Sequence, residues 1–153
     1  MIVYGIATQR RKVEGVAYSY GPEDLRQVLK EVDYLILVVP DTPQTRNMIG
    51  TKELSAMKPS AYLINLARGG IVDERALIQA LEVGKIAGAA LDVFCEEPLP
   101  KNHPLWGFKN AIITPHIGGL SDIYVEQSLS IFEENLRLFL RGDKKNLINL
   151  VEW

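Results

Sequence analysis

Cysteine is nearly absent from this chain of 153 residues, and its one cysteine, Cys95, excludes an internal disulfide. Long apolar runs are missing too, because no stretch approaches the roughly 18 residues of a membrane span. An excess of one charge is also lacking, since the formal net charge is only -2. We see no secretory leader in the first residues. These absences predict a cytoplasmic protein that has neither a membrane nor a nucleic acid as its partner.

Strand-like and helix-like patterns alternate along the chain, whose 47% hydrophobic residues are enough for a core. The expected strands are residues 2–6, 34–39, 62–66, 86–91 and 111–114, with a polar loop at 7–21. The expected helices start near residues 22, 51, 73 and 121, with Asp73 and either Ser121 or Asp122 as N-caps and Gly84 and Gly142 as stops. This alternation predicts an α/β fold with a doubly wound parallel sheet, in which strand 34–39 is covered on both faces.

Three polar side chains follow the last three expected strands. The strand at 62–66 leads to Arg68, the next to Glu97, and the last to His116. Ligands of open parallel sheets bind beyond the carboxyl ends of the strands, so we expect these groups to face one site. Alone, Arg68 suits a surface salt bridge, Glu97 an acidic loop and His116 a backbone-bonded helix entry. Their convergence on one sheet edge favours the functional interpretation.

The three groups suit the reduction of a 2-oxo acid. Arg68 can clamp the substrate carboxylate with its planar guanidinium and polarise the neighbouring carbonyl. His116 can give a proton to the carbonyl oxygen and take it back in the reverse reaction. Glu97, if paired with His116, would fix the tautomer of the imidazole ring.

Long motifs around these residues resemble the D-isomer-specific 2-hydroxyacid dehydrogenases, and the likeness covers essentially the whole chain. They are NLARGGIVDE at 65–74, ALDVF at 90–94 with EPL at 97–99, HPLW at 103–106 and TPHIGG at 114–119. The resemblance implies a Rossmann-like domain, a catalytic trio of Arg68, Glu97 and His116, and a homodimer. It also implies a small 2-hydroxy or 2-oxo acid as substrate, with glyoxylate or hydroxypyruvate ahead of phosphoglycerate and lactate-type acids. Glu97 argues against the formate-oxidising branch.

The resemblance further implies NAD or NADP as cofactor and assigns positions that contact it. These are Val39, Pro40, Leu66, Ala67, Arg68, Asp92, His116, Gly118 and Gly119. Asp92 would hold the nicotinamide carboxamide, and the glycines would allow close backbone approach. Ala7 stands where NAD-dependent relatives usually carry an acid, and Thr8, Arg10 and Arg11 follow it. Cations without a repelling carboxylate suit a 2′-phosphate, which favours NADP; the alternative is an ordinary solvated basic loop.

Two departures from the family pattern stand out. The glycine-rich G-x-G-x-x-G turn is absent, so we expect a domain that lacks its first βα unit and the pyrophosphate cradle. The resemblance also implies that the substrate domain is almost wholly missing from this chain. We expect residues 1–145 to form an incomplete dinucleotide-binding domain and residues 146–153 to lead back towards the substrate domain. We therefore expect the isolated chain to be a weak cofactor binder with little or no activity.

Two alternatives remain open: a non-catalytic dinucleotide-sensing module of the corepressor type, and an inactive truncated fragment. Four further residues carry no predicted chemistry. Cys95 is expected to be a packing or loop residue and His103 to help lock its loop, while Trp106 and Phe108 are expected to anchor that loop against the core. The spacing of histidines and carboxylates indicates no metal site.

Overall fold

The computed structural model describes residues 1–150, which fall into two units, Met1–Gly118 and a second that begins at Gly119. The strands are β1 (Tyr4–Ile6), β2 (Tyr18–Tyr20), β3 (Tyr34–Leu37), β4 (Tyr62–Asn65), β5 (Gly88–Leu91) and β6 (Ala111–Ile113). The α-helices are α1 (Leu25–Val28), α2 (Thr51–Ala56), α3 (Glu74–Glu82) and α4 (Tyr124–Leu140). The predicted domain of residues 1–145 crosses the boundary between the units and stays a prediction. Residues 151–153 of the predicted C-terminal segment lie outside the described residues.

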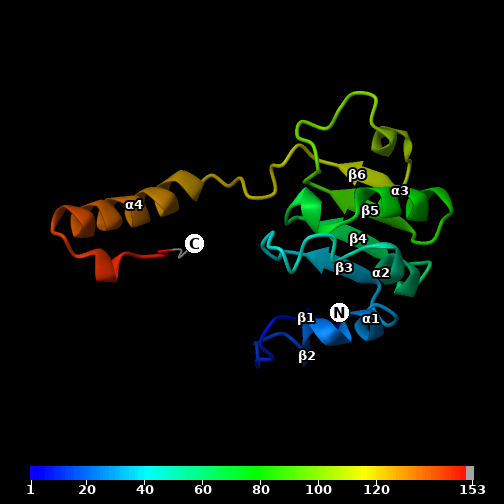
Figure 1. Cartoon of the computed structure of the whole chain (residues 1–153), viewed down its shortest axis with the longest axis horizontal. Coiled ribbons are helices and arrows are strands. Elements are labelled where there is room, and N and C mark those ends of the chain that lie inside the picture. Colours follow the sequence, from blue (N-terminus) through cyan, green and yellow to red (C-terminus); the bar gives the residue numbers. More distant parts are fainter. Residues whose placement is uncertain (151–153) are drawn as a thin grey trace. The chain divides into compact units, whose positions relative to one another are not determined.

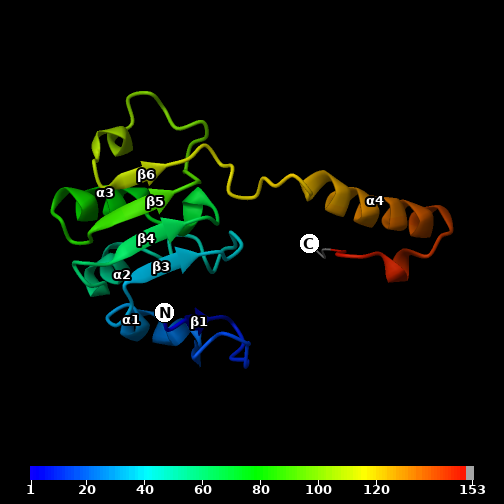
Figure 2. The ribbon, with the colours of Figure 1, turned by 180° about the vertical axis from the view of Figure 1, so that it is seen from behind.

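The first unit contains a four-stranded parallel sheet in the order β3-β4-β5-β6 and a two-stranded parallel sheet of β1 and β2. Figures 1 and 2 show the four strands side by side, with β3 and β6 at the two edges. Helix α2 connects β3 to β4, and α3 connects β4 to β5. Helices between parallel strands confirm the predicted Rossmann-like α/β fold.

The core lies between one face of the large sheet and the helices. Leu37, Leu63 and Leu91 point from three neighbouring strands into the same cluster as Leu54 of α2 and Leu77 of α3. The apolar residues of each strand alternate between this face and the opposite one, as the pleat of a strand requires. A single buried layer therefore supports the strand ends at which the predicted site lies.

The opposite face of the sheet is exposed within this unit. Ile36 is 55% exposed and Val38 74% exposed, so strand 34–39 is not covered on both faces here, contrary to the prediction. Tyr34 and Tyr62 stack on this face with ring centroids 5.9 Å apart. The continuous apolar run was the signal for two-sided burial, but helices α1 to α3 supply only one covering layer.

Helix α3 agrees with its predicted signals. The Asp73 side chain accepts a hydrogen bond from the Ala76 backbone N–H at 3.1 Å, which satisfies one of the free donors of the first turn. Gly84 ends the helix with φ of 63°, a left-handed conformation that glycine adopts without strain. The predicted cap and stop are confirmed.

Other local predictions were wrong. Strand β2 lies inside the expected loop at 7–21. Helix α4 begins at Tyr124 after Ile123, and its N-cap makes no side-chain hydrogen bond, so neither Ser121 nor Asp122 caps it. Gly142 does follow the helix with φ of 76°.

The second unit contains the amphipathic helix α4, a short 3-10 helix at Lys144–Asn146 and the residues that follow it. The Asn135 side chain of α4 holds the backbone of Ile148 through two hydrogen bonds, of 2.7 and 3.0 Å. The helix leaves large apolar side chains exposed, Phe132 and Phe139 among them. Across residues 1–150, no helix combines the length and the apolar character that crossing a bilayer demands.

Candidate active site

The ends of three neighbouring strands are aligned at one edge of the large sheet. Asn65 of β4 pairs with Leu91 of β5, and Leu91 pairs with Ile113 of β6. The residues that follow these strands therefore start from the same level. This register brings the segments that carry Arg68, Glu97 and His116 to one edge, as a parallel sheet predicts.

His116 and Glu97 form a direct pair. Nδ1 of His116 lies 2.7 Å from Oε2 of Glu97, and the other carboxylate oxygen, Oε1, accepts the Phe94 backbone N–H at 2.9 Å. The bond from His116, with help from the Phe94 amide and the charge of Arg68, holds the pKa of Glu97 below its ordinary value. The carboxylate is therefore ionised at neutral pH, and it turns the Nε2 edge of the imidazole ring away from itself.

A buried carboxylate fixes the turn that carries His116. Asp92 is 3% exposed and accepts hydrogen bonds from the Thr114 hydroxyl and the backbone N–H groups of Ile117 and Gly118. Burial raises the pKa of Asp92, but these three hydrogen bonds and the nearby His116 outweigh it, so the pKa lies below the ordinary value. The carboxylate thus anchors both sides of His116.

The backbone of His116 is held in an unusual conformation. Its φ is 54°, in the left-handed region that few residues other than glycine adopt. Such a conformation costs of the order of 1–3 kcal/mol and persists where the surroundings enforce it, as Asp92 does here. Gly118 completes the turn, because a Cβ there would lie 2.8 Å from Oδ2 of Asp92. Gly119 is the first residue of the second unit.

Arg68 is presented by a turn that the buried Asn65 shapes. The Asn65 amide accepts the Ala67 backbone N–H and donates to the carbonyl oxygen of Arg68, both at 3.0 Å. The Arg68 side chain is exposed and donates to the Ala67 carbonyl oxygen at 2.6 Å. Its charge also acts on Glu97, so the cation and the His116–Glu97 pair share one neighbourhood.

Two hollows flank these groups. One, of about 660 Å³, is mainly apolar and is lined by residues that include Phe94, Leu99, Trp106 and His116. The other, of about 640 Å³, lies beside Arg68 and is lined by Val38, Val39, Pro40, Asp41, Leu66, Ala67 and Arg68. The second hollow brings together five of the residues predicted to contact a dinucleotide, on the ends of β3 and β4.

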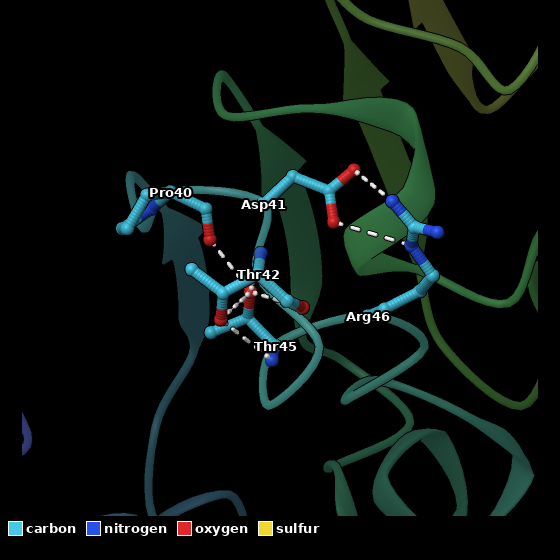
Figure 3. Close-up of polar contacts among 5 residues, drawn as sticks. All are labelled: Pro40, Asp41, Thr42, Thr45 and Arg46. Atoms are coloured by element: carbon cyan, nitrogen blue, oxygen red, sulfur yellow. Dashed lines mark hydrogen bonds and ion pairs between the residues drawn. The ribbon is translucent and has the colours of Figure 1, made fainter. Parts of the chain in front are cut away.

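The loop after β3 is fixed by its own side chains (Figure 3). The Thr45 hydroxyl donates to the Pro40 carbonyl oxygen at 2.6 Å and accepts the Thr42 backbone N–H at 2.8 Å. Arg46 pairs with Asp41 at 3.2 Å. This network holds Val39 and Pro40 at the rim of the second hollow, and the sequence pattern did not indicate it.

The loop after β5 is tied to α3 by a second histidine. His103 Nε2 lies 3.1 Å from Oε1 of Glu74, and its Nδ1 accepts the Leu105 backbone N–H at 3.3 Å. Trp106 is 54% exposed, so its prediction as a core anchor was wrong; Leu105, 1% exposed, fills that place and Phe108 packs partly against the core. Burial and nearby carboxylates raise the pKa of Cys95, whose side chain remains exposed.

The basic residues after β1 lie in the loop that joins β1 to β2, the two strands of the smaller sheet. Arg10 pairs with Glu23 at 2.7 Å and with Asp24 at 2.8 Å. The hydrogen bond that Arg10 donates to Glu23 is the main cause of the raised pKa of Arg10. Thr8 and Arg11 are exposed on the same loop. The Arg10 guanidinium is therefore already neutralised by two carboxylates of this chain.

Three contributors to the site were missed by reasoning from the sequence. Asn65, Thr114 and the Phe94 amide act only through backbone groups or through partners on another strand. An asparagine at the buried end of an apolar strand was the one available signal, because a buried amide needs partners.

Comparisons with known proteins identify the family of this chain. Residues 1–118 match the family model of the D-isomer specific 2-hydroxyacid dehydrogenase NAD binding domain. A glyoxylate reductase from Thermococcus litoralis is 43% identical over 152 residues, which are 97% of this chain and 44% of that protein. A D-3-phosphoglycerate dehydrogenase from Methanocaldococcus jannaschii is 43% identical over 139 residues, 88% of this chain and 26% of that protein.

Among solved structures, a D-isomer specific 2-hydroxyacid dehydrogenase from Xanthobacter autotrophicus Py2, in complex with NADPH and MES, superposes with a TM-score of 0.89. It is 36% identical, and the match covers 98% of this chain and 60% of that one. The chain spans less than half the length of the two curated relatives. Its strand-end site, its motifs and these matches together place the chain in the D-isomer-specific 2-hydroxyacid dehydrogenase family, of which it carries the NAD-binding domain.

Proposed function

We propose that this chain supplies the dinucleotide-binding and acid–base part of an NAD(P)-dependent dehydrogenase that interconverts a small 2-oxo acid and its 2-hydroxy acid. The observation that carries the proposal is the 2.7 Å contact between His116 and Glu97 beside the charge of Arg68. A cation and an oriented proton donor at one strand edge match the charges of a 2-oxo acid and its developing alkoxide.

The geometry supports the following proposed roles. The residues that line the hollow beside Arg68 would hold a reduced dinucleotide, and this group would supply the hydride for the carbonyl carbon. Arg68 binds the substrate carboxylate, and its exposed guanidinium retains free N–H donors for a bidentate contact. Glu97 accepts a hydrogen bond from the Nδ1–H group of His116, which leaves the protonated Nε2 free to give its proton to the carbonyl oxygen.

The chain's own residues also fit the cofactor. Val39, Pro40, Leu66 and Ala67 line the hollow in which we place the dinucleotide, and Gly118 gives the His116 turn close backbone approach to Asp92. We propose that Asp92, whose Oδ2 accepts the Gly118 N–H and has a second lone pair, also receives the nicotinamide carboxamide. Thr8 and Arg11, both exposed, complete the proposed contacts within the first unit, and the contact expected at Gly119 stays a prediction.

Glyoxylate or hydroxypyruvate is the proposed substrate, ahead of phosphoglycerate. The Thermococcus litoralis relative is named a glyoxylate reductase, which supports glyoxylate. The Methanocaldococcus jannaschii relative is named a D-3-phosphoglycerate dehydrogenase, so phosphoglycerate is the next candidate. The test is a chimera in which this chain replaces the matching 152-residue stretch of the Thermococcus litoralis enzyme. We expect oxidation of NADPH or NADH with glyoxylate, and a loss of about 10²–10⁴-fold in kcat for His116→Gln.

The control for the chimera is Glu96→Gln, which changes the neighbouring carboxylate and leaves the Glu97–His116 pair intact. Glu97→Gln should lower kcat, while Glu96→Gln should not. A folded chimera that binds dinucleotide and turns over none of the 2-oxo acids would support the second candidate, a non-catalytic dinucleotide sensor. The retained trio is compatible with either candidate, so turnover decides between them.

NADP is the proposed cofactor ahead of NAD. The NADPH bound to the Xanthobacter autotrophicus relative supports this choice, and Arg11 is exposed on the loop after β1. Arg10 is occupied by Glu23 and Asp24, so we assign the 2′-phosphate first to Arg11. Arg11→Ala in the chimera should weaken NADPH binding and leave NADH binding unchanged, with Arg75→Ala on α3 as the control. If the chimera prefers NADH both with and without Arg11→Ala, the proposal that NADP is the cofactor is wrong.

A further inference from the structure

Gly69 brings the Arg68 turn into direct backbone contact with the loop that follows β5. A Cβ at Gly69 would overlap the carbonyl carbon and oxygen of Phe94 and the nitrogen of Cys95. All three are backbone atoms, which cannot rotate aside as the end of a flexible side chain can. Any side chain at position 69 must therefore push the two segments apart.

The contacted segment is the one that holds the proposed acid–base pair. The Phe94 N–H donates to Oε1 of Glu97 at 2.9 Å, and Oε2 of the same carboxylate holds His116 at 2.7 Å. The Phe94–Cys95 peptide group that contacts Gly69 is therefore next to the Phe94 N–H that orients Glu97. A displacement of Phe94 would move that donor.

The other side of the turn is fixed to the sheet. Asn65, 1% exposed, bonds to the backbone of Ala67 and Arg68 from the end of β4. Gly70 faces the loop after β3. A Cβ at Gly70 would lie 3.2 Å from Oδ2 of Asp41, which belongs to the network of Figure 3. The turn is therefore held between the loop after β3 and the loop after β5, with little room to yield.

We propose that Gly69 is a positioning residue, whose missing side chain sets the separation between Arg68 and the Glu97–His116 pair. Its catalytic meaning rests on the proposed function, but the spacing itself is a property of the folded chain. It acts through the Phe94 amide and touches no reacting atom. The proposal can be tested without substrate or cofactor, so its failure is distinguishable from failure of the proposed function.

The experiment compares Gly69→Ala with Gly107→Ala in the 153-residue chain by NMR. Gly107 lies in the same loop, and a Cβ added there would have nothing within 4 Å, which makes it a matched control. In Gly69→Ala, the titration midpoint of the Glu97 carboxyl carbon should rise towards that of an ordinary glutamate. Gly107→Ala should leave it unchanged. An unchanged midpoint in a folded Gly69→Ala variant overturns the proposal.

A second measurement covers the case in which Gly69→Ala does not fold. In the unmodified chain, the Phe94 amide signal should follow the titration of Glu97, because it donates to that carboxylate. If the backbone contact transmits the ionisation of Glu97, the chemical shift of the Gly69 amide should change with the same midpoint. The chemical shift of the Gly107 amide should stay constant. A Gly69 signal that ignores the Glu97 titration would overturn the proposal without any variant.

Discussion

Single residues at this strand edge act mainly by fixing one another. Glu97 orients His116 from one side, and Asp92 holds the backbone on both sides of that histidine. Both carboxyl groups have a pKa below the ordinary value, because hydrogen bonds favour their charged forms. The ionised state of these two groups is therefore part of the folded structure.

The lowered pKa of Glu97 predicts how stability changes in acid. A carboxyl group with a depressed folded-state pKa stabilises the fold above its unfolded value, 4.5, and this contribution is lost as pH falls through the folded value. Between pH 5 and pH 3, Glu97→Gln should therefore lose less free energy of unfolding than the unmodified chain does. Urea denaturation at several pH values measures the difference. Glu96→Gln is the control, and equal losses in all three proteins would contradict the prediction.

Asn65 predicts a local cost in stability. Asn65→Leu keeps a similar volume but leaves the Ala67 N–H and the Arg68 carbonyl oxygen without their partner. Unsatisfied buried polar groups cost about 1–3 kcal/mol each, so the free energy of unfolding should fall by at least this amount. Asn110→Leu removes an exposed bond to the Ala87 carbonyl oxygen and should cost less than about 1 kcal/mol. Similar losses in the two variants, measured by urea denaturation, would refute the argument.

At the scale of elements, helix ends differ in how they are held. Helix α3 has a side-chain cap at Asp73, whereas α4 begins after Ile123 with no such bond. A capping residue satisfies donors that the first turn leaves free. The start of α3 also carries Glu74, which holds His103 of the loop after β5, so this end supports the site as well as the helix.

The two helix starts predict opposite results for matched variants. Asp73→Ala should lower the free energy of unfolding by about 0.5–2 kcal/mol, because the Ala76 N–H loses its acceptor. Asp122→Ala removes a similar residue that caps nothing and should change stability by less than about 0.5 kcal/mol. Thermal or urea unfolding measures both. A larger effect at Asp122 would show that this residue caps α4 in solution.

The elements differ in how well their sequence predicts them. Long periodic segments such as α3 and the apolar strands were placed correctly, because burial of one face leaves a regular pattern. Strand β2 was missed, because Tyr18–Tyr20 is short and is a strand only through its pairing with β1. Strand order predicted that Glu97 and His116 face one site, whereas their direct pairing was only a condition of the role expected for Glu97. Gly69 could not be found, because its partners are backbone atoms that no local pattern reveals. Asn65 gave one signal, a polar residue at the end of an apolar strand, but its backbone partners could not be named from it.

For the whole molecule, the uncovered face of the large sheet is the main consequence of the first unit's architecture. Three apolar side chains of the first unit are each more than half exposed. They are Ile36 on β3, Val38 directly after β3, and Ile112 on β6. Contiguous apolar surface of this kind favours association, and the edges of the sheet add unpaired backbone groups. The homodimer that the family resemblance implies stays a prediction.

We expect the isolated chain to associate as its concentration rises. Ile112→Lys, at a side chain that is 68% exposed, should weaken association by about tenfold, or about 1.4 kcal/mol, because a charge opposes burial of this face. Val83→Lys, at a residue 72% exposed after α3, is the control and should leave association unchanged. Sedimentation velocity over a range of concentrations measures both. A monomer at every concentration would contradict the expectation.

The alignment of Asn65, Leu91 and Ile113 across three strands also limits how the chain can change in length. One residue inserted within β5 would turn Leu91 out of the core and carry Asp92 away from the amides of Ile117 and Gly118. An insertion in the surface turn around Gly84 would leave that alignment intact. Tolerated insertions and deletions should therefore gather at the opposite end of the sheet from His116.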